Sequence, residues 1–445
     1  MNSDHFTLSG FRRWMQKINS GEFFWVILGQ LTSAVGSLAA VRLLTAYLDA
    51  EAYGKFALGS TIALLVNQSL FGPLTNACVR YWSVYKENQQ IRAFLKVVYK
   101  LVAYLSLVFV LFSIATYFIV SSKAPEWKSI YVFGSCFALT SGYISILNGL
   151  QLAERHRKIV AWHQGLSQWI QPLFAIILIA SSTKNSSAAM LGYLVGCTVT
   201  LSSQLLLFRP NLKVVGQISD TAVSSQKIRK QLIVYAYPFA SWGLITWMHL
   251  ASDRWALQAF CGEEKVGFYT VLYQLGYQPI TLAGSVLVQF IYPILFERAG
   301  DLSNPLKVKN AIHLLFKIMM IMVAVSFCVV IITLIGHRSI LHLFAAPEYE
   351  KFSHLLPFMM LASTIFNIAQ MVTLLPMMFF DSKVLLYPKI FSGVIGTLLN
   401  ILLISRYGLN GAIVANIASA SFYLIWILTS SWRQINHVLN GNLLV

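Results

Sequence analysis

Charged residues are scarce in this sequence. Asp, Glu, Lys and Arg make up 11% of its 445 residues, whereas a soluble domain contains about 25%. Hydrophobic residues make up 57%, and the mean hydropathy is +0.65. This composition excludes an ordinary soluble globule and is typical of an all-α protein that crosses a membrane several times.

Acidic residues are scarcer than basic ones, with 16 Asp and Glu against 33 Lys and Arg. A formal charge of +17 could indicate a nucleic-acid partner. When the N-terminus is placed in the cytoplasm and the spans alternate, however, nearly all of the basic excess falls on the cytoplasmic side. The positive-inside rule therefore accounts for the charge. We expect both termini in the cytoplasm and no nucleic-acid partner.

Sequence motifs of common enzymes are absent. The chain contains no P-loop, no HExxH, no GxSxG and no CxxC. The longest predicted outer loop, about 336 to 354, is too short to house a glycan-processing active site. The N-terminal stretch lacks the apolar core of a cleavable signal peptide. We expect a protein that is not an enzyme, with no catalytic residue, metal or cofactor.

Apolar runs long enough to cross a bilayer recur along the whole sequence, and each crossing needs about 20 mostly apolar residues. The predicted spans are 23–43, 55–78, 97–121, 128–150, 160–182, 187–208, 232–252, 267–295, 311–336, 355–380, 385–405 and 410–431. These about twelve transmembrane helices predict two six-helix bundles, 23–208 and 232–431. A cytoplasmic linker at 209–231 joins the bundles, and cytoplasmic tails at 1–22 and 432–445 flank them.

Two internal matches indicate that the halves are parallel repeats. The end of the first predicted span and the start of the second match the corresponding stretch of the second half. The aligned pairs are Arg42 and Arg254, Gly54 and Gly267, and Phe56 and Tyr269. The fifth and eleventh predicted helices also match without gaps, which places Lys158 on Lys383. Parallel repeats of six helices are typical of transporters whose substrate path runs between the halves.

Polar side chains within the spans are the candidate binding residues. Lipid offers amides and cations no partner, so they face a cavity or one another. Arginine can hold a phosphate through two parallel hydrogen bonds, which suits an anionic substrate. The candidates for pyrophosphate and sugar binding are Arg42, Arg80, Arg254, Gln30, Gln164, Gln168, Gln274 and Lys389. The alternatives are interhelical hydrogen bonds for the amides and snorkelling to the interface for Arg80 and Lys389.

Asp253 is the one prominent acid at a predicted helix end, directly before Arg254. Its carboxylate could form a structural ion pair with Arg42 or Arg254, which we favour. Alternatively, it could take up a coupling ion. Coupling to H⁺ or Na⁺ therefore stays open at this stage.

Four short motifs resemble the polysaccharide flippases of the multidrug/oligosaccharidyl-lipid/polysaccharide exporter (MOP) superfamily, which include O-antigen and exopolysaccharide flippases. The motifs are Arg42 to Leu58, Asn76 to Tyr81, Ser252 to Tyr269, and Tyr407 to Ala412. Arg42, Arg80, Asp253 and Arg254 match the family pattern.

This resemblance implies two MATE-like bundles around a cationic cavity. By alternating access, they would move an oligosaccharide linked to undecaprenyl pyrophosphate from the inner to the outer leaflet of the bacterial inner membrane. Such an activity serves the synthesis of lipopolysaccharide or another polysaccharide. The implied partners are the lipid-linked oligosaccharide, membrane lipids and polysaccharide polymerase machinery, and we expect a monomer.

Three other functions predict different sequence features. A cation-coupled drug or small-solute exporter of the same fold would predict an acidic cavity. A major-facilitator transporter would carry a glycine-rich loop after its second helix, and residues 79–96 contain no glycine. A membrane glycan polymerase or ligase would need a large outer loop.

Overall fold

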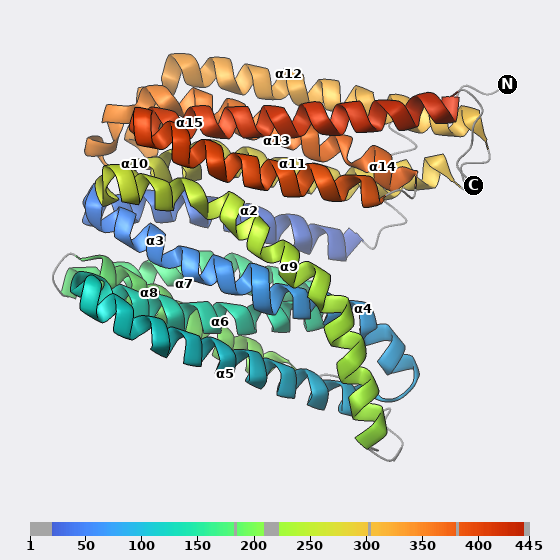
Figure 1. The fold of residues 1–445 in the computed structure, drawn as a ribbon, viewed down its shortest axis with the longest axis horizontal. Helices are drawn as coiled ribbons and strands as arrows, with labels where there is room; N and C mark the ends of the chain where they lie inside the picture. The colour runs from blue at the N-terminus through green and yellow to red at the C-terminus, as the bar shows by residue number, and fades with distance from the viewer. Residues whose placement is uncertain (1–19, 182–184, 209–221, 301–303, 380–381, 440–445) are drawn as a thin grey trace. The chain divides into compact units, whose positions relative to one another are not determined.

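The computed structural model describes residues 20–181, 185–208, 222–300, 304–379 and 382–439 (Figure 1). Within these ranges the chain forms helices and short connections, with no strand. The predicted N-terminal tail lies almost entirely outside the described residues. So do most of the predicted linker and the end of the C-terminal tail.

The helices follow one another with short connections. In chain order they are α2 (Ser20–Tyr47), α3 (Ala50–Val66), α4 (Gly72–Glu87), α5 (Ile91–Lys123), α6 (Lys128–Ala153), α7 (Arg157–Ser181), α8 (Ser186–Leu207), α9 (Ala222–Cys261), α10 (Glu263–Leu272), α11 (Gln278–Ala299), α12 (Pro305–Phe344), α13 (Leu356–Val372), α14 (Leu374–Met378) and α15 (Leu386–Leu439). The π turns are η1 (Asn67–Phe71) and η4 (Tyr273–Tyr277), and the 3₁₀ turns are η2 (Pro125–Trp127), η5 (Pro347–Leu355) and η6 (Ser382–Leu385).

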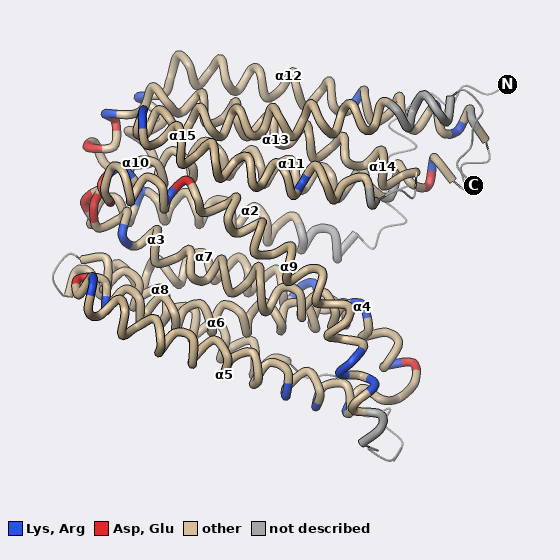
Figure 2. Tube along the Cα trace, in the orientation of Figure 1, with Lys and Arg blue, Asp and Glu red and all other residues tan. Residues whose placement is uncertain are grey.

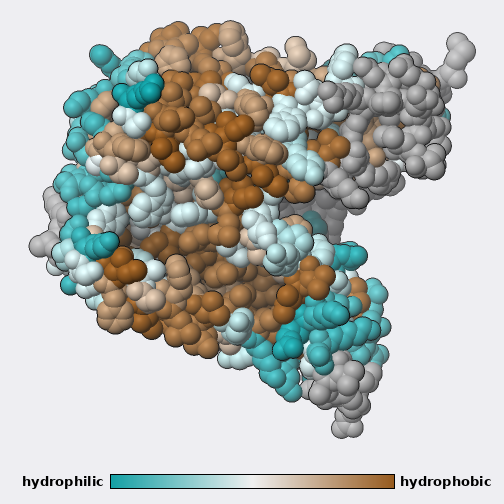
Figure 3. Space-filling view, in the orientation of Figure 1, coloured by the Kyte–Doolittle hydropathy of each residue, from teal (hydrophilic) through white to brown (hydrophobic). Residues whose placement is uncertain are grey.

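The helices have the length and surface of membrane spans. Among the described residues, nine helical runs are long and apolar enough to cross a bilayer. Figure 2 shows long stretches of most helices without a charge, and Figure 3 shows hydrophobic surface over the middle of the helices. The longest run, Leu386–Trp432, is interrupted at Gly408, where φ is 57°. The chain is therefore a multi-pass membrane protein, while the number of twelve spans stays a prediction.

Several helices extend well beyond the predicted spans. α9 begins at Ala222, inside the predicted linker, and α12 continues to Phe344. Together with η5, the end of α12 fills most of the predicted outer loop at 336–354. At about 1.5 Å per residue the 40 residues of α12 measure about 60 Å, about twice the hydrocarbon thickness. An apolar window detects only the part of a helix inside the hydrocarbon, so it misses these polar continuations.

By their contacts, the residues form two compact units. Unit 1 comprises residues 1–47 and 59–244, and unit 2 comprises 48–58 and 245–445. Each unit consists mainly of one half of the sequence, but the start of α3 joins the second half. The predicted bundle limits themselves stay a prediction.

Small residues bring the helices of unit 1 close together. α2 crosses α7 where Gly29 faces Ala161, and a Cβ atom added to Gly29 would stand 2.8 Å from the Ala161 Cβ. α8 crosses α7 where a Cβ atom on Gly192 would overlap the Ala175 backbone. Close backbone approach of this kind is the usual way membrane helices gain packing energy, because lipid is as apolar as their side chains.

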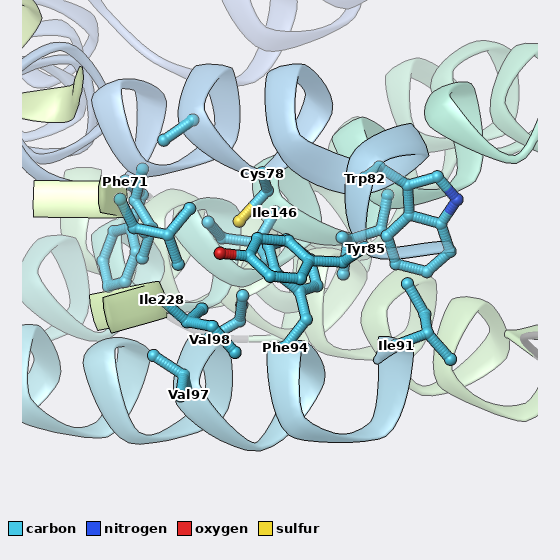
Figure 4. Packing of buried hydrophobic residues seen from close by; sticks show 14 of the residues in the cluster. Phe71, Cys78, Trp82, Tyr85, Ile91, Phe94, Val97, Val98, Ile146 and Ile228 are labelled. Atoms are coloured by element: carbon cyan, nitrogen blue, oxygen red, sulfur yellow. The ribbon is translucent and has the colours of Figure 1, made fainter. Parts of the chain in front are cut away.

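Aromatic side chains fill the space between α4 and α5 in unit 1 (Figure 4). The rings of Tyr85 and Phe94 are stacked with centroids 5.2 Å apart, and Trp82 meets Phe94 edge-on at 6.0 Å. The Tyr85 hydroxyl donates a hydrogen bond to the Gln231 side chain near the start of α9. This contact attaches the first part of α9 to unit 1.

The two repeat segments meet in unit 2 at their aligned glycines. A Cβ atom on Gly54 would collide with the carbonyl oxygen of Glu263. A Cβ atom on Gly267 would collide with the carbonyl oxygen of Ala50. The start of α3 and the start of α10 therefore cross in direct backbone contact, which only glycine permits at these two positions.

The two π turns occupy corresponding helices of the two halves. η1 is followed by Gly72-Pro73, and η4 is followed by Gln278-Pro279. Proline has no N–H for the carbonyl one turn earlier, and its ring crowds that carbonyl. A wider π turn directly before the proline relieves this conflict, and π turns frequently occur at functional sites.

The glycine crossing predicts an unusual response to alanine. Gly54→Ala and Gly267→Ala should lower the melting temperature of the purified protein, although alanine normally favours a helix. Forcing the two backbones apart should cost about 1–3 kcal/mol. Gly336→Ala is the matched control because no atom lies within 4 Å of its added Cβ. Equal melting temperatures for all three variants would show that the crossing is not tight.

Candidate functional site

A buried ion pair lies on α9 in unit 2. Asp253 and Arg254 are only 2% and 8% exposed. The Arg254 Nη1 atom lies 3.8 Å from Asp253 Oδ1 and donates a hydrogen bond of 2.8 Å to the Leu250 carbonyl. The Arg254 backbone N–H donates to Asp253 Oδ1 at 2.7 Å. Each charge therefore has a partner, which a buried charge requires.

Two further helices complete the surroundings of the carboxylate. The Tyr269 hydroxyl on α10 donates a hydrogen bond to Asp253 Oδ2. Asn416 on α15 donates through Nδ2 to the Tyr269 oxygen at 3.0 Å and to the Ala412 carbonyl at 2.9 Å. One chain of hydrogen bonds thus joins α9, α10 and α15 around Asp253.

Arg254 also lies against a column of tyrosine rings. Its guanidinium carbon is 4.6 Å from the ring centroid of Tyr273 and 5.9 Å from that of Tyr269. Tyr273 stacks on Tyr277 at 4.9 Å, with the two ring planes 12° apart. A cation over a desolvated aromatic ring gains about 2 kcal/mol. We refer to Asp253, Arg254, Tyr269, Tyr273 and Asn416 as the Arg254 cluster.

The column follows from the spacing of its tyrosines along α10 and η4. Residues spaced by four lie on one side of a helix, and Tyr269, Tyr273 and Tyr277 have this spacing. Tyr273 and Tyr277 are the first and last residues of η4. The rings of Tyr273 and Tyr277 lie almost parallel, and Arg254 contacts the Tyr273 end of this stack.

Six buried polar side-chain atoms in unit 2 have no hydrogen-bond partner among the described residues, and three of them belong to imidazole or amide groups. These three are His249 Nδ1, Gln274 Oε1 and Asn400 Oδ1. The other end of the Asn400 amide donates to the Ser252 hydroxyl at 3.0 Å. Unpaired polar atoms are costly inside a membrane protein. They mark places where water, an ion or a polar ligand can bind.

The structure distributes the predicted site residues over both units. Arg254 and Asp253 lie together, and Gln274 follows Tyr273 on η4. Lys389 is half-buried on α15.

Arg42 and Arg80 are exposed on α2 and α4 of unit 1. On α2 and α7, which pack together in unit 1, Gln30 and Gln164 are half-buried and Gln168 is exposed. Their membership in one binding site stays a prediction.

Asn416 is a member of the Arg254 cluster that the sequence analysis missed. It lies in the predicted span 410–431, which is mostly apolar. An amide in such a span is the same signal that makes Gln164 and Gln274 candidates. Its partner Tyr269 could not be inferred, because α10 and α15 are far apart in the sequence.

Solved structures with the same fold are transporters and a flippase. The lipid II flippase MurJ in an inward closed conformation matches with a TM-score of 0.66 and 15% identity, covering 95% of this chain and 89% of that one. An inward-facing MATE family multidrug transporter of the MOP superfamily matches with a TM-score of 0.64 and 13% identity, covering 93% and 96%. A mutant of the Vibrio cholerae MATE transporter VcmN matches with a TM-score of 0.62 and 11% identity, covering 94% and 96%. These matches confirm the predicted all-α, MATE-like membrane fold.

The family model "Polysaccharide biosynthesis protein" matches residues 21–298, which is more than half of the chain. This protein therefore belongs to that polysaccharide biosynthesis family, as the sequence resemblance indicated. No curated protein sequence matches the chain significantly.

The ion pair yields a prediction about stability. Asp253→Ala should destabilise the protein by about 3–5 kcal/mol, because it leaves the buried Arg254 charge without its acid. The double variant Asp253→Leu, Arg254→Met should be more stable than Asp253→Ala, since it removes both charges. Thermal unfolding of purified protein measures the difference.

An exposed pair in the same unit is the control. Glu51 and Lys55 form an ion pair of 2.7 Å one helical turn apart, and Glu51 is largely exposed. Glu51→Ala should change stability by no more than about 1 kcal/mol. If the Asp253→Leu, Arg254→Met double variant is as unstable as Asp253→Ala, the Asp253–Arg254 pair stabilises the protein through its packing and not through its charge.

Proposed function

We propose that this protein is a flippase for a lipid-linked oligosaccharide. Its substrate would be a saccharide carried on undecaprenyl pyrophosphate, moved from the inner to the outer leaflet of the bacterial inner membrane. Membership of a polysaccharide biosynthesis family and a fold shared with MurJ support this proposal.

Buried Arg254 is the observation that most supports this proposal, and we propose that it binds the substrate. A charged side chain inside a membrane protein is costly and marks a substrate or ion path. The pyrophosphate–sugar headgroup is anionic and polar, and it cannot cross hydrocarbon unaided. A guanidinium is always charged and fits phosphate oxygens through two parallel hydrogen bonds. Arg254, positioned by Asp253 and Tyr273, would replace part of the water around the pyrophosphate.

The remaining parts of the proposal follow from the sequence. Alternating access would expose the site first to the cytoplasm, where both termini lie, and then to the outer face. The lipid tail would stay in the bilayer, and polysaccharide polymerase machinery would take over the delivered oligosaccharide, as in the synthesis of O-antigen, exopolysaccharide or lipopolysaccharide. The protein would act as a monomer and would not be an enzyme. Coupling to H⁺ or Na⁺ would act through groups near Asp253.

A drug or small-solute exporter is the second candidate, because MATE multidrug transporters share the fold. Organic cations would be held by free carboxylates. In the Arg254 cluster the only carboxylate, Asp253, is occupied by Arg254 and Tyr269. This arrangement favours an anionic substrate.

Substitution of Arg254 tests the proposal. In cells whose own gene is deleted, Arg254→Ala should reduce surface glycan about ten- to a hundredfold, the effect of losing one hydrogen bond to a charged group. Arg254→Lys should give intermediate export, because lysine keeps the charge but not the planar fork. Arg406→Ala, at an exposed arginine of unit 2, is the control and should export normally. Normal surface glycan from a well-expressed Arg254→Ala variant would remove Arg254 from the substrate path.

Deletion of the gene tests the substrate class. We expect the lipid-linked precursor to accumulate in the inner leaflet and surface glycan to disappear, and the sugars of the precursor would identify the substrate. Unchanged precursor and surface glycan, in a strain without a second flippase gene, would favour the drug or small-solute exporter.

A further inference from the structure

Unit 1 contains a cavity lined only by residues of that unit. The cavity has a volume of about 190 Å³ and lies among η1, α4, α6 and α9. The side chains that matter most for its chemistry are those of Gln68, Thr75, Asn76, Ser145, Phe239 and Trp242.

The backbone builds this cavity. A Cβ atom on Gly243 would collide with the carbonyl oxygen of Gln68, so α9 lies directly against the π turn η1. Immediately after η1, Gly72 and Pro73 line the cavity. Main-chain atoms and a proline therefore form one part of the cavity wall, and side chains form the rest.

The lining combines two kinds of surface. Gln68, Asn76, Thr75 and Ser145 offer amide and hydroxyl groups, while Phe239 and Trp242 offer aromatic rings. No hydrogen bond joins the Gln68 or Asn76 side chain to another described residue. None of the nine lining residues is charged. Apolar and aromatic walls with a few polar groups are typical of small-molecule sites, but a bare pyrophosphate would find no cation here.

A neutral sugar ring has the matching surfaces. Its hydroxyl groups lie around the edge and form hydrogen bonds, while its C–H bonds create an apolar face that packs on an aromatic ring. The cavity, with a volume of about 190 Å³, has room for a sugar ring.

A row of aromatic rings leads to the cavity from the C-terminal part of α4. Tyr85 and Tyr81 have ring centroids 6.4 Å apart, and Tyr81 meets Tyr235 on α9 at 5.8 Å. Tyr235 in turn lies 5.4 Å from Phe239, which lines the cavity. The row therefore extends the aromatic wall along unit 1 by several ring widths.

We propose that this cavity, the η1 pocket, binds one neutral sugar residue of the lipid-linked oligosaccharide, with Trp242 and Phe239 against its apolar face and Gln68 and Asn76 at its hydroxyl groups. The aromatic row contacts neighbouring sugars. This inference rests on the proposed function, which assigns the pyrophosphate to Arg254, and it assigns a neutral sugar to the η1 pocket.

The test measures binding of two probes to the purified full-length protein by titration calorimetry. One probe is the oligosaccharide released by mild acid from the lipid-linked precursor of the source cells. The other is inorganic pyrophosphate. Trp242→Ala and Asn76→Ala should each bind the oligosaccharide about tenfold more weakly, the effect of losing one stacking contact or hydrogen bond. Both variants should bind pyrophosphate as the wild type does.

Matched variants keep the result interpretable. Trp162→Ala removes a tryptophan on α7 that is 60% exposed and does not line the pocket, and it should bind both probes normally. Arg254→Ala should lose pyrophosphate binding and keep oligosaccharide binding. Asn76 is exposed, so its replacement leaves the fold intact even where Trp242→Ala does not.

The outcomes separate the two proposals. Normal oligosaccharide binding by Asn76→Ala and Trp242→Ala would overturn the η1 pocket and leave the flippase proposal standing. A wild-type protein that binds neither probe would overturn both. If Asn76→Ala weakens binding of both probes equally, Asn76 supports the fold of the protein and does not bind a sugar, which would also overturn the η1 pocket.

Discussion

The bilayer offers no hydrogen-bond partner, and this single constraint explains most of the structure. Backbone groups in hydrocarbon must be satisfied within the protein, which leaves helices as the only regular element of the described chain. The same constraint places charged side chains at helix ends (Figure 2). It also requires a partner for any charge that remains inside, and Asp253 and Tyr269 supply this environment for Arg254.

Both units contain a π turn, but the side chains around the two turns differ in chemistry. In each unit a π turn precedes a proline and lines a polar region. In unit 2 the turn η4 carries Tyr273 and Tyr277, whose rings stack, and the Tyr273 ring lies 4.6 Å from the Arg254 guanidinium carbon. In unit 1 the turn η1 leaves a neutral cavity with amides and aromatic rings. The same irregular turn thus occurs in both units, with different side chains around each copy.

Much of the fold could be predicted from the sequence because hydrocarbon selects apolar runs of about 20 residues. The ends of α9 and α12 could not, since a helix continues into water without an apolar signal. The adjacency of Asp253 and Arg254 is visible in the sequence, and so is the polar nature of η4. The hydrogen bonds from Tyr269 and Asn416 depend on tertiary packing, and neither π turn has a signal beyond the proline that follows it.

The backbone crossing of Gly54 and Gly267 has a consequence for biosynthesis. The start of α3 enters the membrane early but packs against residues that are made roughly 200 positions later. At about 5–20 residues per second, it waits on the order of ten to forty seconds for its partner. During this interval the segment 48–58 has no native neighbour from the second half, so the nascent chain must hold an incomplete first half in the lipid. Unit 2 can therefore complete its packing only after the segments around Gly54 and Gly267 have both been inserted. Its assembly is a late event, and it makes the folding of the second half depend on a segment from the first.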